Sequence, residues 1–258
     1  MYQFFVEPGQ INGRSITITG PDVNHIRNVL RMKPGDELSV SNGQDGKEYR
    51  CGIESFGEDT VYCTLRFIKE DGLELPSKIY LFQALPKADK MELVVQKAVE
   101  LGAFCVVPVA AKRCVMKIDP KKEKTKLAHW QGIAEAAAKQ SKRRIIPEVH
   151  SVMTMKEAAA MASEMDVRLI PYELAEGMGH TRELIGQIRP GQSIAVFIGP
   201  EGGFEDSEIQ TELDAGIEPV TMGRRILRTE TAGFTMLSWI MYQLEGAEAE
   251  QSGTEPEP

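Results

Sequence analysis

The first 72 residues alternate between apolar and polar positions with a period of two, which is typical of strands that bury one face. Pro-Gly, Asn-Gly and Asp-Gly pairs interrupt the alternation and favour tight turns between strands. The pattern predicts strands at residues 2–6, 15–19, 37–42, 47–56 and 61–68. Short strands joined by such turns favour a small β-barrel.

One helical segment interrupts these strands and begins near Pro21. Arg27 and Arg31 are four residues apart, so they share one side of this helix, away from its apolar side. Such a pair either keeps one helix face in water or binds phosphate groups.

The apolar pattern changes after a linker at residues 70–76. Continuous apolar runs then alternate with stretches in which apolar residues recur every three or four positions. Strands are predicted at residues 79–84, 104–109, 145–149, 167–170, 194–198 and 219–222, and helices at residues 89–101, 123–141, 154–164, 207–215 and 231–244. This alternation predicts an α/β fold in which a mostly parallel sheet carries helices on both faces.

Three parts are therefore expected along the chain: a barrel at residues 1–72, an α/β domain at residues 73–245 and a tail at residues 246–258. The tail is acidic, contains Pro and Gly and has no apolar period, so we expect it to be disordered.

The composition is that of an ordinary globular protein, with 258 residues of which 42% are hydrophobic and 26% charged. The longest apolar run, at residues 104–111, is much shorter than the roughly 18 residues of a membrane span. The N-terminus lacks the basic and apolar regions of a secretory signal, so a cytoplasmic location is expected. The four cysteines show neither CxxC nor metal-ligand spacing, so we expect reduced thiols and no metal.

The net charge of −8 conceals a strong bias along the chain. Residues 85–147 carry 14 basic and 6 acidic side chains, whereas residues 148–258 carry 7 basic and 20 acidic ones. The basic region favours a face that binds a polyanion with salt-dependent affinity. Its lysines at positions 121, 122, 124 and 126 also fit the simpler alternative of a solvated helix start.

A glycine-bearing loop follows the predicted strand at residues 194–198. Its sequence, Gly199-Pro200-Glu201-Gly202-Gly203, comes where ligands bind in parallel sheets, and glycine allows a ligand to approach the backbone closely. The spacing matches neither a dinucleotide fingerprint nor a P-loop. The alternative is a tight turn between strand and helix.

A second junction begins at Met222-Gly223 and continues to residue 232. It holds three arginines and Glu230, which would be expensive to bury without partners, so a site is favoured over packing. Between the arginines, Ile226 and Leu227 offer main-chain amides and carbonyls to a flat heterocycle such as adenine.

These two segments, residues 198–203 and 222–232, resemble the two cofactor motifs of the SPOUT methyltransferases. Within that class the chain is similar to the RsmE family, the 16S rRNA N3-uridine methyltransferases, over nearly its whole length to about Leu244. Further matching motifs lie at residues 25–31 with Gly35, at 97–102, at 135–143 and at 171–173.

The resemblance implies a PUA-like RNA-binding barrel and a catalytic domain with a C-terminal trefoil knot. It also implies a homodimer that uses S-adenosylmethionine to methylate N3 of a uridine in the decoding region of the small ribosomal subunit. Carried over residue by residue, it implies a cofactor site at Ile198, Gly199, Pro200, Glu201, Gly202, Gly203, Met222, Gly223, Ile226, Leu227, Arg228, Thr231 and Ala232. Met222 stands where the family pattern has Leu, a near-isosteric change.

Methyl transfer from a sulfonium mainly requires alignment of the attacking nitrogen and removal of its proton. Arg228 and Glu230 are the first candidates for catalysis, with Glu201 and Glu173 as further carboxylates near the predicted site. Arg228 fits stabilisation of a uracil anion by charge. The candidates for RNA contact, mainly with phosphates, are Arg27, Arg31, Lys87, Lys90, Arg113, Gln140, Arg143 and Arg144.

Two other readings remain open. One is a non-catalytic RNA-binding or ribosome-assembly protein that kept the fold, against which the two intact loop motifs argue. The other is the same enzyme class acting on another RNA such as tRNA, which the N-terminal and central motifs disfavour.

Overall fold

The computed structural model describes residues 1–70, 73–172, 175 and 177–252. The chain forms two compact units. The first comprises Met1–Glu74 with Ala138–Ile146, and the second comprises Leu75–Ala137 with Pro147–Pro258.

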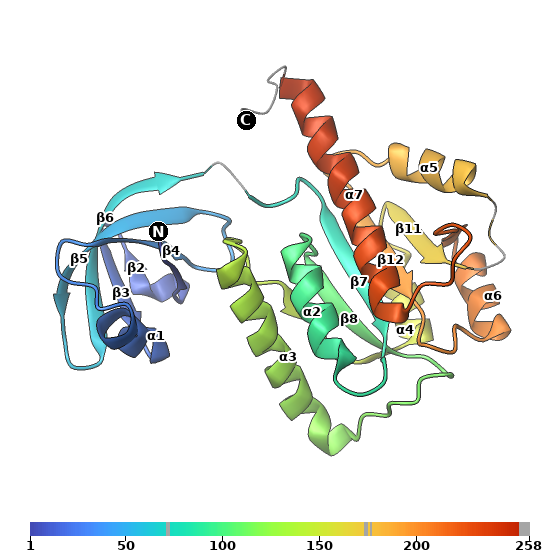
Figure 1. Ribbon diagram of the computed structural model, residues 1–258, viewed down its shortest axis with the longest axis horizontal. Helices are drawn as coiled ribbons and strands as arrows, with labels where there is room; N and C mark the ends of the chain where they lie inside the picture. The colour runs from blue at the N-terminus through green and yellow to red at the C-terminus, as the bar shows by residue number, and fades with distance from the viewer. Residues whose placement is uncertain (71–72, 173–174, 176, 253–258) are drawn as a thin grey trace. The chain divides into compact units, whose positions relative to one another are not determined.

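The described part of the first unit holds one six-stranded sheet in the order β1-β4-β5-β6-β3-β2 (Figure 1). Strand β1 pairs with β4 in parallel, and the other pairings are antiparallel. The elements are β1 (Gln3–Phe5), η1 (Pro8–Gln10), β2 (Ile11–Asn12), β3 (Ser15–Thr19), α1 (Pro21–Asn24), η2 (His25–Val29), β4 (Glu37–Ser41), β5 (Glu48–Phe56) and β6 (Thr60–Lys69). The five predicted strands are confirmed, and the two-residue β2 was missed because so short a strand shows no period.

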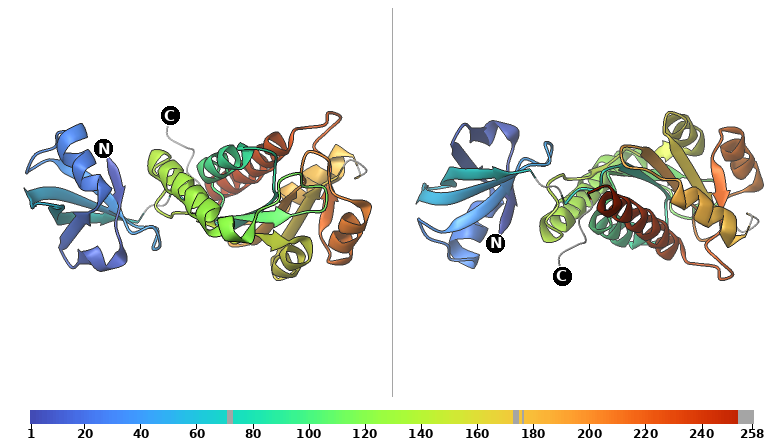
Figure 2. Two further views of the ribbon diagram at one scale, coloured as in Figure 1. Left: turned by 90° about the horizontal axis from the view of Figure 1, so that it is seen from below. Right: turned by 90° about the horizontal axis from the view of Figure 1, so that it is seen from above.

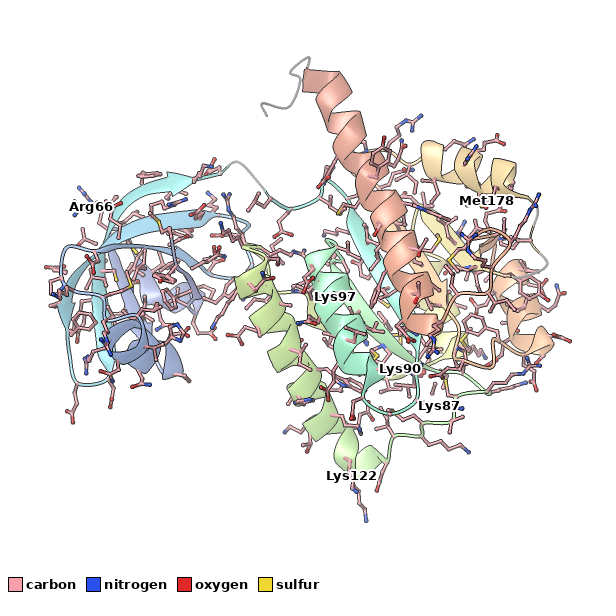
Figure 3. The ribbon with its side chains drawn as sticks, viewed as in Figure 1. Arg66, Lys87, Lys90, Lys97, Lys122 and Met178 are labelled. Carbon is pink, nitrogen blue, oxygen red and sulfur yellow. The ribbon has the colours of Figure 1, made fainter. Side chains whose placement is uncertain are left out.

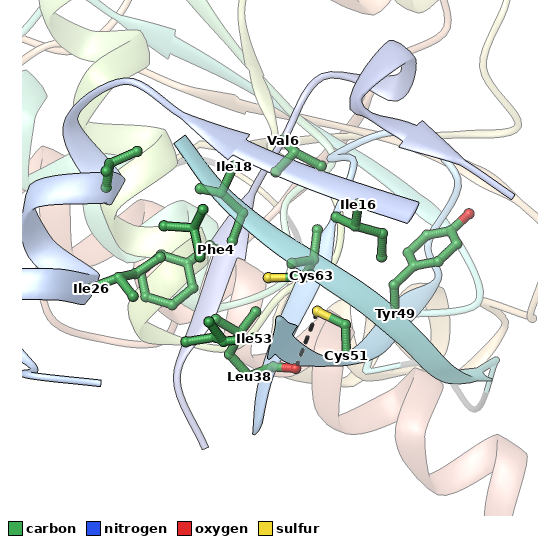
Figure 4. Packing of buried hydrophobic residues seen from close by; sticks show 13 residues of the cluster. Phe4, Val6, Ile16, Ile18, Ile26, Leu38, Tyr49, Cys51, Ile53 and Cys63 are labelled. Carbon is green, nitrogen blue, oxygen red and sulfur yellow. Dashed lines mark hydrogen bonds between the residues drawn. The ribbon is translucent and has the colours of Figure 1, made fainter. Parts of the chain in front are cut away.

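The core of this unit comes from alternate positions of its strands (Figure 4). Ile16 and Ile18 of β3 are buried, as are Phe4 of β1 and Cys51 and Cys63 of β5 and β6. Strands near both ends of the sheet thus contribute to one core, which requires the sheet to curve strongly. The two cysteines are free thiols, as expected.

The segment Ala138–Ile146 belongs to the first unit although it lies far along the sequence. Ile145 forms a bridge with Gly43, so the strand predicted at residues 145–149 is wrong at its start. Only β9 (Glu148–Val149) joins the sheet of the second unit. The first two residues of the predicted strand, 145 and 146, belong instead to the first unit, where Ile145 pairs with Gly43.

The second unit confirms the predicted parallel sheet. Its strands follow the order β10-β8-β7-β12-β11-β13, with β9 beside β8, and every pairing recorded among the described residues is parallel. Helices α2 and α7 cover one face, and α4 and α6 cover the other (Figure 2). Besides β9, the elements are β7 (Lys78–Ala84), α2 (Lys90–Glu100), β8 (Cys105–Ala110), α3 (Pro120–Gln140), β10 (Met153–Thr154), α4 (Met155–Ala162), β11 (Val167–Pro171), α5 (Met178–Gly186), β12 (Ser193–Ile198), α6 (Asp206–Asp214), β13 (Glu218–Val220) and α7 (Thr229–Ser252).

Two helices depart from the sequence prediction. Helix α5 was missed because Thr181 is its one buried residue, so no apolar stripe marks it. Helix α7 begins at Thr229 and runs to Ser252. It therefore extends past residue 244, where the predicted helix ends. The disordered tail at residues 246–258 stays a prediction, and residues 253–258 lie outside the described part.

The central strands are buried on both faces, as parallel strands between helix layers must be. Phe82 of β7 stacks on Phe197 of β12 with ring centroids 4.5 Å apart. In register, Gln83 pairs with Ile198, so the carboxyl ends of β7 and β12 lie side by side. No described helix is long and apolar enough to cross a membrane.

Candidate active site

Two glycine-bearing loops leave the carboxyl edge of the parallel sheet of the second unit. The first, at residues 199–205, follows β12, and the second, at residues 221–228, follows β13. Strand β11 lies between β12 and β13, so both loops start from the same edge. This is where ligands bind in open parallel sheets.

Thr229, the first residue of α7, ties the two loops together. Its Oγ1 donates a hydrogen bond to the carbonyl of Gly199 at 2.6 Å. The same oxygen accepts from Nε2 of the fully buried Gln83 at 2.9 Å. Neither Thr229 nor Gln83 was among the predicted site residues, although Thr229 lies within the second motif and a glutamine within an apolar strand was a usable signal.

The backbone of the first loop turns sharply at Gly203, where φ is +67°, a value that favours glycine. The Gly203 N–H donates to the carbonyl of Pro200 at 2.9 Å, closing the turn. A Cβ atom at Gly203 would meet no described atom within 4 Å, so this backbone is open to a ligand. A Cβ atom at Gly199 would lie 3.2 Å from the Phe204 ring, so that glycine serves packing.

The second loop is held at its start by Thr181 of α5. Thr181 Oγ1 donates to the carbonyl of Thr221 at 3.1 Å and accepts from its N–H at 3.0 Å. Gly223 follows with φ +98°, and a Cβ atom there would meet nothing within 4 Å among the described residues. The Ile226 side chain is 93% exposed, and Arg228 is exposed as well.

Carboxylates from the two loop motifs converge on one lysine. Lys90 Nζ lies 3.1 Å from Glu201 Oε1 and 3.2 Å from Glu230 Oε2. The Lys87 N–H also donates to Glu201 Oε1 at 3.1 Å. Figure 3 shows Lys87 and Lys90 where the loop after β7 enters α2.

These contacts change the proton affinities of the groups involved. Burial alone would raise the pKa of Glu201, but main-chain N–H groups, including that of Lys87, and the Lys90 ammonium hold it below its ordinary value. The hydrogen bond to Glu201 raises the pKa of Lys90, and Glu230 adds to the effect. Both groups are therefore charged at neutral pH.

Arg113, which follows β8, also contacts the first loop. Its Nη1 donates to the carbonyl of Gly202 at 3.2 Å. Beside it, the Lys112 N–H donates to Glu208 Oε1 at 2.8 Å, and Lys112 Nζ bonds Glu205 at 2.7 Å. Three of the predicted RNA contacts, Lys87, Lys90 and Arg113, thus lie around the predicted cofactor loop.

The other predicted RNA contacts lie in the first unit and its flanks. Arg27 bonds the carbonyls of Gly57 and Glu58 and covers the Phe56 ring, so it is largely engaged within its own unit. Arg31 is exposed. Gln140 at the end of α3 is exposed too, and Glu173 lies outside the described residues.

Arg143 and Arg144 are buried, with 5% and 2% of their surfaces exposed. Arg143 Nη2 bonds Glu74 Oε2 at 2.6 Å, and Arg144 Nη2 bonds Glu48 Oε2 at 3.0 Å. In these positions they hold the segment Ala138–Ile146 within the first unit. Their guanidinium groups do not face solvent, which speaks against the predicted phosphate contact.

Comparisons with known proteins agree with this arrangement. The family model for the RNA methyltransferase domain matches residues 73–241, and that for the RNA methyltransferase PUA domain matches residues 18–66. The chain is 36% identical to the ribosomal RNA small subunit methyltransferase E of Bacillus subtilis, over 95% of this chain and 98% of that protein.

Two solved structures are similar to this chain throughout. The ribosomal RNA small subunit methyltransferase E of Neisseria gonorrhoeae, bound to S-adenosyl methionine, aligns with a TM-score of 0.80 at 29% identity, covering 94% of this chain and 97% of that one. A methyltransferase from Legionella pneumophila with its bound cofactor aligns with a TM-score of 0.80 at 33% identity, covering 93% and 96%. The chain therefore belongs to the RNA methyltransferase family, with an α/β methyltransferase domain that follows an RNA methyltransferase PUA domain.

Proposed function

We propose that this protein transfers a methyl group from S-adenosylmethionine to N3 of a uridine in the decoding region of 16S rRNA, in the small ribosomal subunit. The observation that carries the proposal is the convergence of Glu201 and Glu230 on Lys90, together with the Thr229 bond between the two loops. The names of the relatives support the RNA, and the resemblance of the motifs supports the uridine position.

The residues present fit S-adenosylmethionine. The carboxylates of Glu201 and Glu230 come together where the two loops meet, and carboxylates suit a sulfonium cation. The backbones at Gly203 and Gly223 are open, and the main chain at Ile226 and Leu227 can bond an adenine edge. The residues proposed to hold the cofactor are Ile198, Gly199, Pro200, Glu201, Gly202, Gly203, Met222, Gly223, Ile226, Leu227, Arg228, Thr231 and Ala232.

When bound, S-adenosylmethionine supplies a methyl group already activated by its sulfonium. The chain must then hold the uracil in line and allow the N3 proton to leave. Arg228 is assigned to stabilising negative charge on the uracil. Glu230, in the first turn of α7, is the carboxylate assigned to the proton.

RNA contact is assigned to the exposed basic groups, with Lys87 and Arg113 near the site and Arg31 and Gln140 elsewhere. Such contacts position the RNA through its phosphates. The target base must leave its stack to reach the loops, as in other enzymes that modify bases. A homodimer, a trefoil knot at the C-terminal end and a cytoplasmic location follow from the family and the substrate, and belong to the same proposal. A solution mass near that of a monomer would contradict the dimer.

The decisive experiment measures transfer of labelled methyl to unmodified small subunits, free 16S rRNA and tRNA, with the product nucleoside identified by mass spectrometry. We expect 3-methyluridine in small subunits. Label in tRNA alone would contradict the proposed substrate. Binding of RNA without transfer to any RNA would favour a non-catalytic binding protein.

The same assay tests Arg228. We expect Arg228→Ala to lower kcat by about a hundredfold or more, because stabilisation of transition-state charge is lost, while RNA binding stays. Arg182→Ala removes an exposed arginine from α5 of the same unit and serves as the charge-matched control. Full turnover by Arg228→Ala would exclude this role.

A further inference from the structure

Lys90 is placed by an unusual turn of the backbone. Helix α2 begins at Lys90, directly after the loop that follows β7. Within that loop Ala88 has φ +52°, a region that residues other than glycine seldom adopt. Backbone strain of this kind is found at functional sites, where surrounding contacts maintain it. Here it lies between Lys87 and Lys90, both of which contact Glu201.

The ammonium of Lys90 joins two segments that lie apart in the sequence. It is 3.1 Å from Glu201 in the first loop and 3.2 Å from Glu230 in α7. The Glu230 side chain is 14% exposed, and its Oε2 has no hydrogen-bond partner among the described residues. Lys90 is therefore the cation that compensates this oxygen within ion-pair distance.

The same contacts argue against a phosphate-binding role for Lys90. Two carboxylates pair with this one ammonium, so its charge is already compensated within the fold. The position that sequence analysis assigned to RNA contact has a different use in the fold.

We propose that Lys90 is a positioning residue that holds the cofactor loop, through Glu201, and the reactive carboxylate Glu230 in one arrangement. The inference rests on the proposed function, because it assigns Glu230 to the methyl-transfer site. Lys90 does not touch the reacting atoms. It acts through its two carboxylate partners. Removing Lys90 should therefore change cofactor affinity and kcat more than RNA affinity.

Three variants test this assignment. Lys90→Met removes the charge and keeps the stem, Lys90→Arg keeps the charge, and Lys97→Met removes a lysine that pairs with Glu100 two turns along the same helix. Calorimetry with S-adenosylmethionine and with its demethylated product measures binding without RNA and without turnover. Steady-state kinetics then give kcat, KM for RNA and the pH profile of kcat.

We expect Lys90→Met to weaken binding of S-adenosylmethionine about tenfold, the typical effect of losing one charge-assisted contact. We also expect a lower kcat and a shift of the acidic limb of the kcat–pH profile to higher pH. The KM for RNA should stay within about twofold of wild type. Lys90→Arg should restore most of the binding, and Lys97→Met should match wild type.

A raised KM for RNA with unchanged cofactor binding would overturn the proposal and return Lys90 to RNA contact. Unchanged values throughout would overturn it as well. If Lys90→Met fails to fold, Lys90→Arg and Glu201→Gln carry the test, since Glu201→Gln should weaken cofactor binding in the same way. Normal cofactor binding by a wild-type protein that methylates no RNA would contradict the proposed function instead, so the two failures are distinguishable.

Discussion

Both units of this protein bury glutamate, and the surroundings of Glu48 in the first unit and Glu212 in the second are opposite in kind. In the first unit Glu48 accepts from Ser39 Oγ at 2.8 Å and from Arg144 Nη2 at 3.0 Å. In the second unit Glu212 of α6 is fully buried, and neither carboxylate oxygen has a hydrogen-bond partner in the described chain.

The proton affinities follow from these surroundings. Burial acts to raise the pKa of Glu48, but the Ser39 hydroxyl and the charges of Arg50 and Arg144 lower it below its ordinary value. Burial raises the pKa of Glu212 to about 7, and the nearby Glu208 adds to the shift. The first unit thus keeps a buried ion pair, whereas the second tolerates a buried acid that is half protonated near neutral pH.

The basic region at residues 85–147 likewise contains both buried and exposed charges. Arg143 and Arg144 are buried in the first unit as anchors for a returning segment. Lys90 and Arg113 remain partly exposed around the first glycine loop of the second unit. Breaking a buried pair carries a large penalty in stability, whereas an exposed pair contributes little to it.

The largest expected effect on stability comes from removing Arg144. We expect Arg144→Met to destabilise the protein by about 3 kcal/mol, the lower end of the range for a broken buried pair, because the buried Glu48 loses Arg144 and keeps Arg50 and Ser39 as partners. Denaturant unfolding measures the change, and Lys122→Ala, an exposed lysine of α3, is the control. A change below about 1 kcal/mol, the range of exposed pairs, would contradict the structural role.

The second prediction concerns Glu212. Because its folded-state pKa lies above the ordinary value of 4.5, folding favours the protonated form, and stability is lost as pH rises from about 4.5 to about 7. Between pH 5 and pH 8 the ionisation of this group alone lowers the free energy of unfolding by about 2.5 kcal/mol.

The glutamine of Glu212→Gln cannot ionise, so this variant escapes the loss of stability at high pH. We expect its free energy of unfolding, minus that of wild type, to be larger at pH 8 than at pH 5. Denaturant curves at the two pH values test this. Exposed Glu164→Gln should show no such dependence. Equal effects of Glu212→Gln at both pH values would mean that Glu212 stays ionised in the fold.

The smallest expected effect is that of Thr229→Val. Loss of the hydroxyl leaves the Gly199 carbonyl and Gln83 Nε2 with one partner fewer, at about 1 to 2 kcal/mol of unfolding free energy. Cofactor binding should weaken as well, because the two loops are no longer joined. Thr235→Val removes an exposed hydroxyl that bonds Thr231 in the same helix, and should change neither quantity. Normal cofactor binding by Thr229→Val would show that the loops align without this bond.

Much of the fold was predictable because its signals are local. Alternation along β3, with Ile16 and Ile18 buried, predicts a one-sided sheet, and the continuous apolar run of β12 predicts a strand buried on both faces. The two glycine loops were found in the same way, since turn chemistry and neighbouring arginines stand together in the sequence. Helix α5 was not, because Thr181 is its one buried residue and no apolar stripe marks it.

Periodicity and turn residues act over a few positions, so the amino-acid sequence was enough to predict most of the strands, the parallel sheet and the two loop motifs. The ion-pair partners, by contrast, can be identified only in the folded structure. Nothing local assigns Arg144 to Glu48, 96 residues away, or Lys90 to Glu201, 111 residues away. Ion pairing depends on distance in space and on burial, and both exist only once the chain has folded.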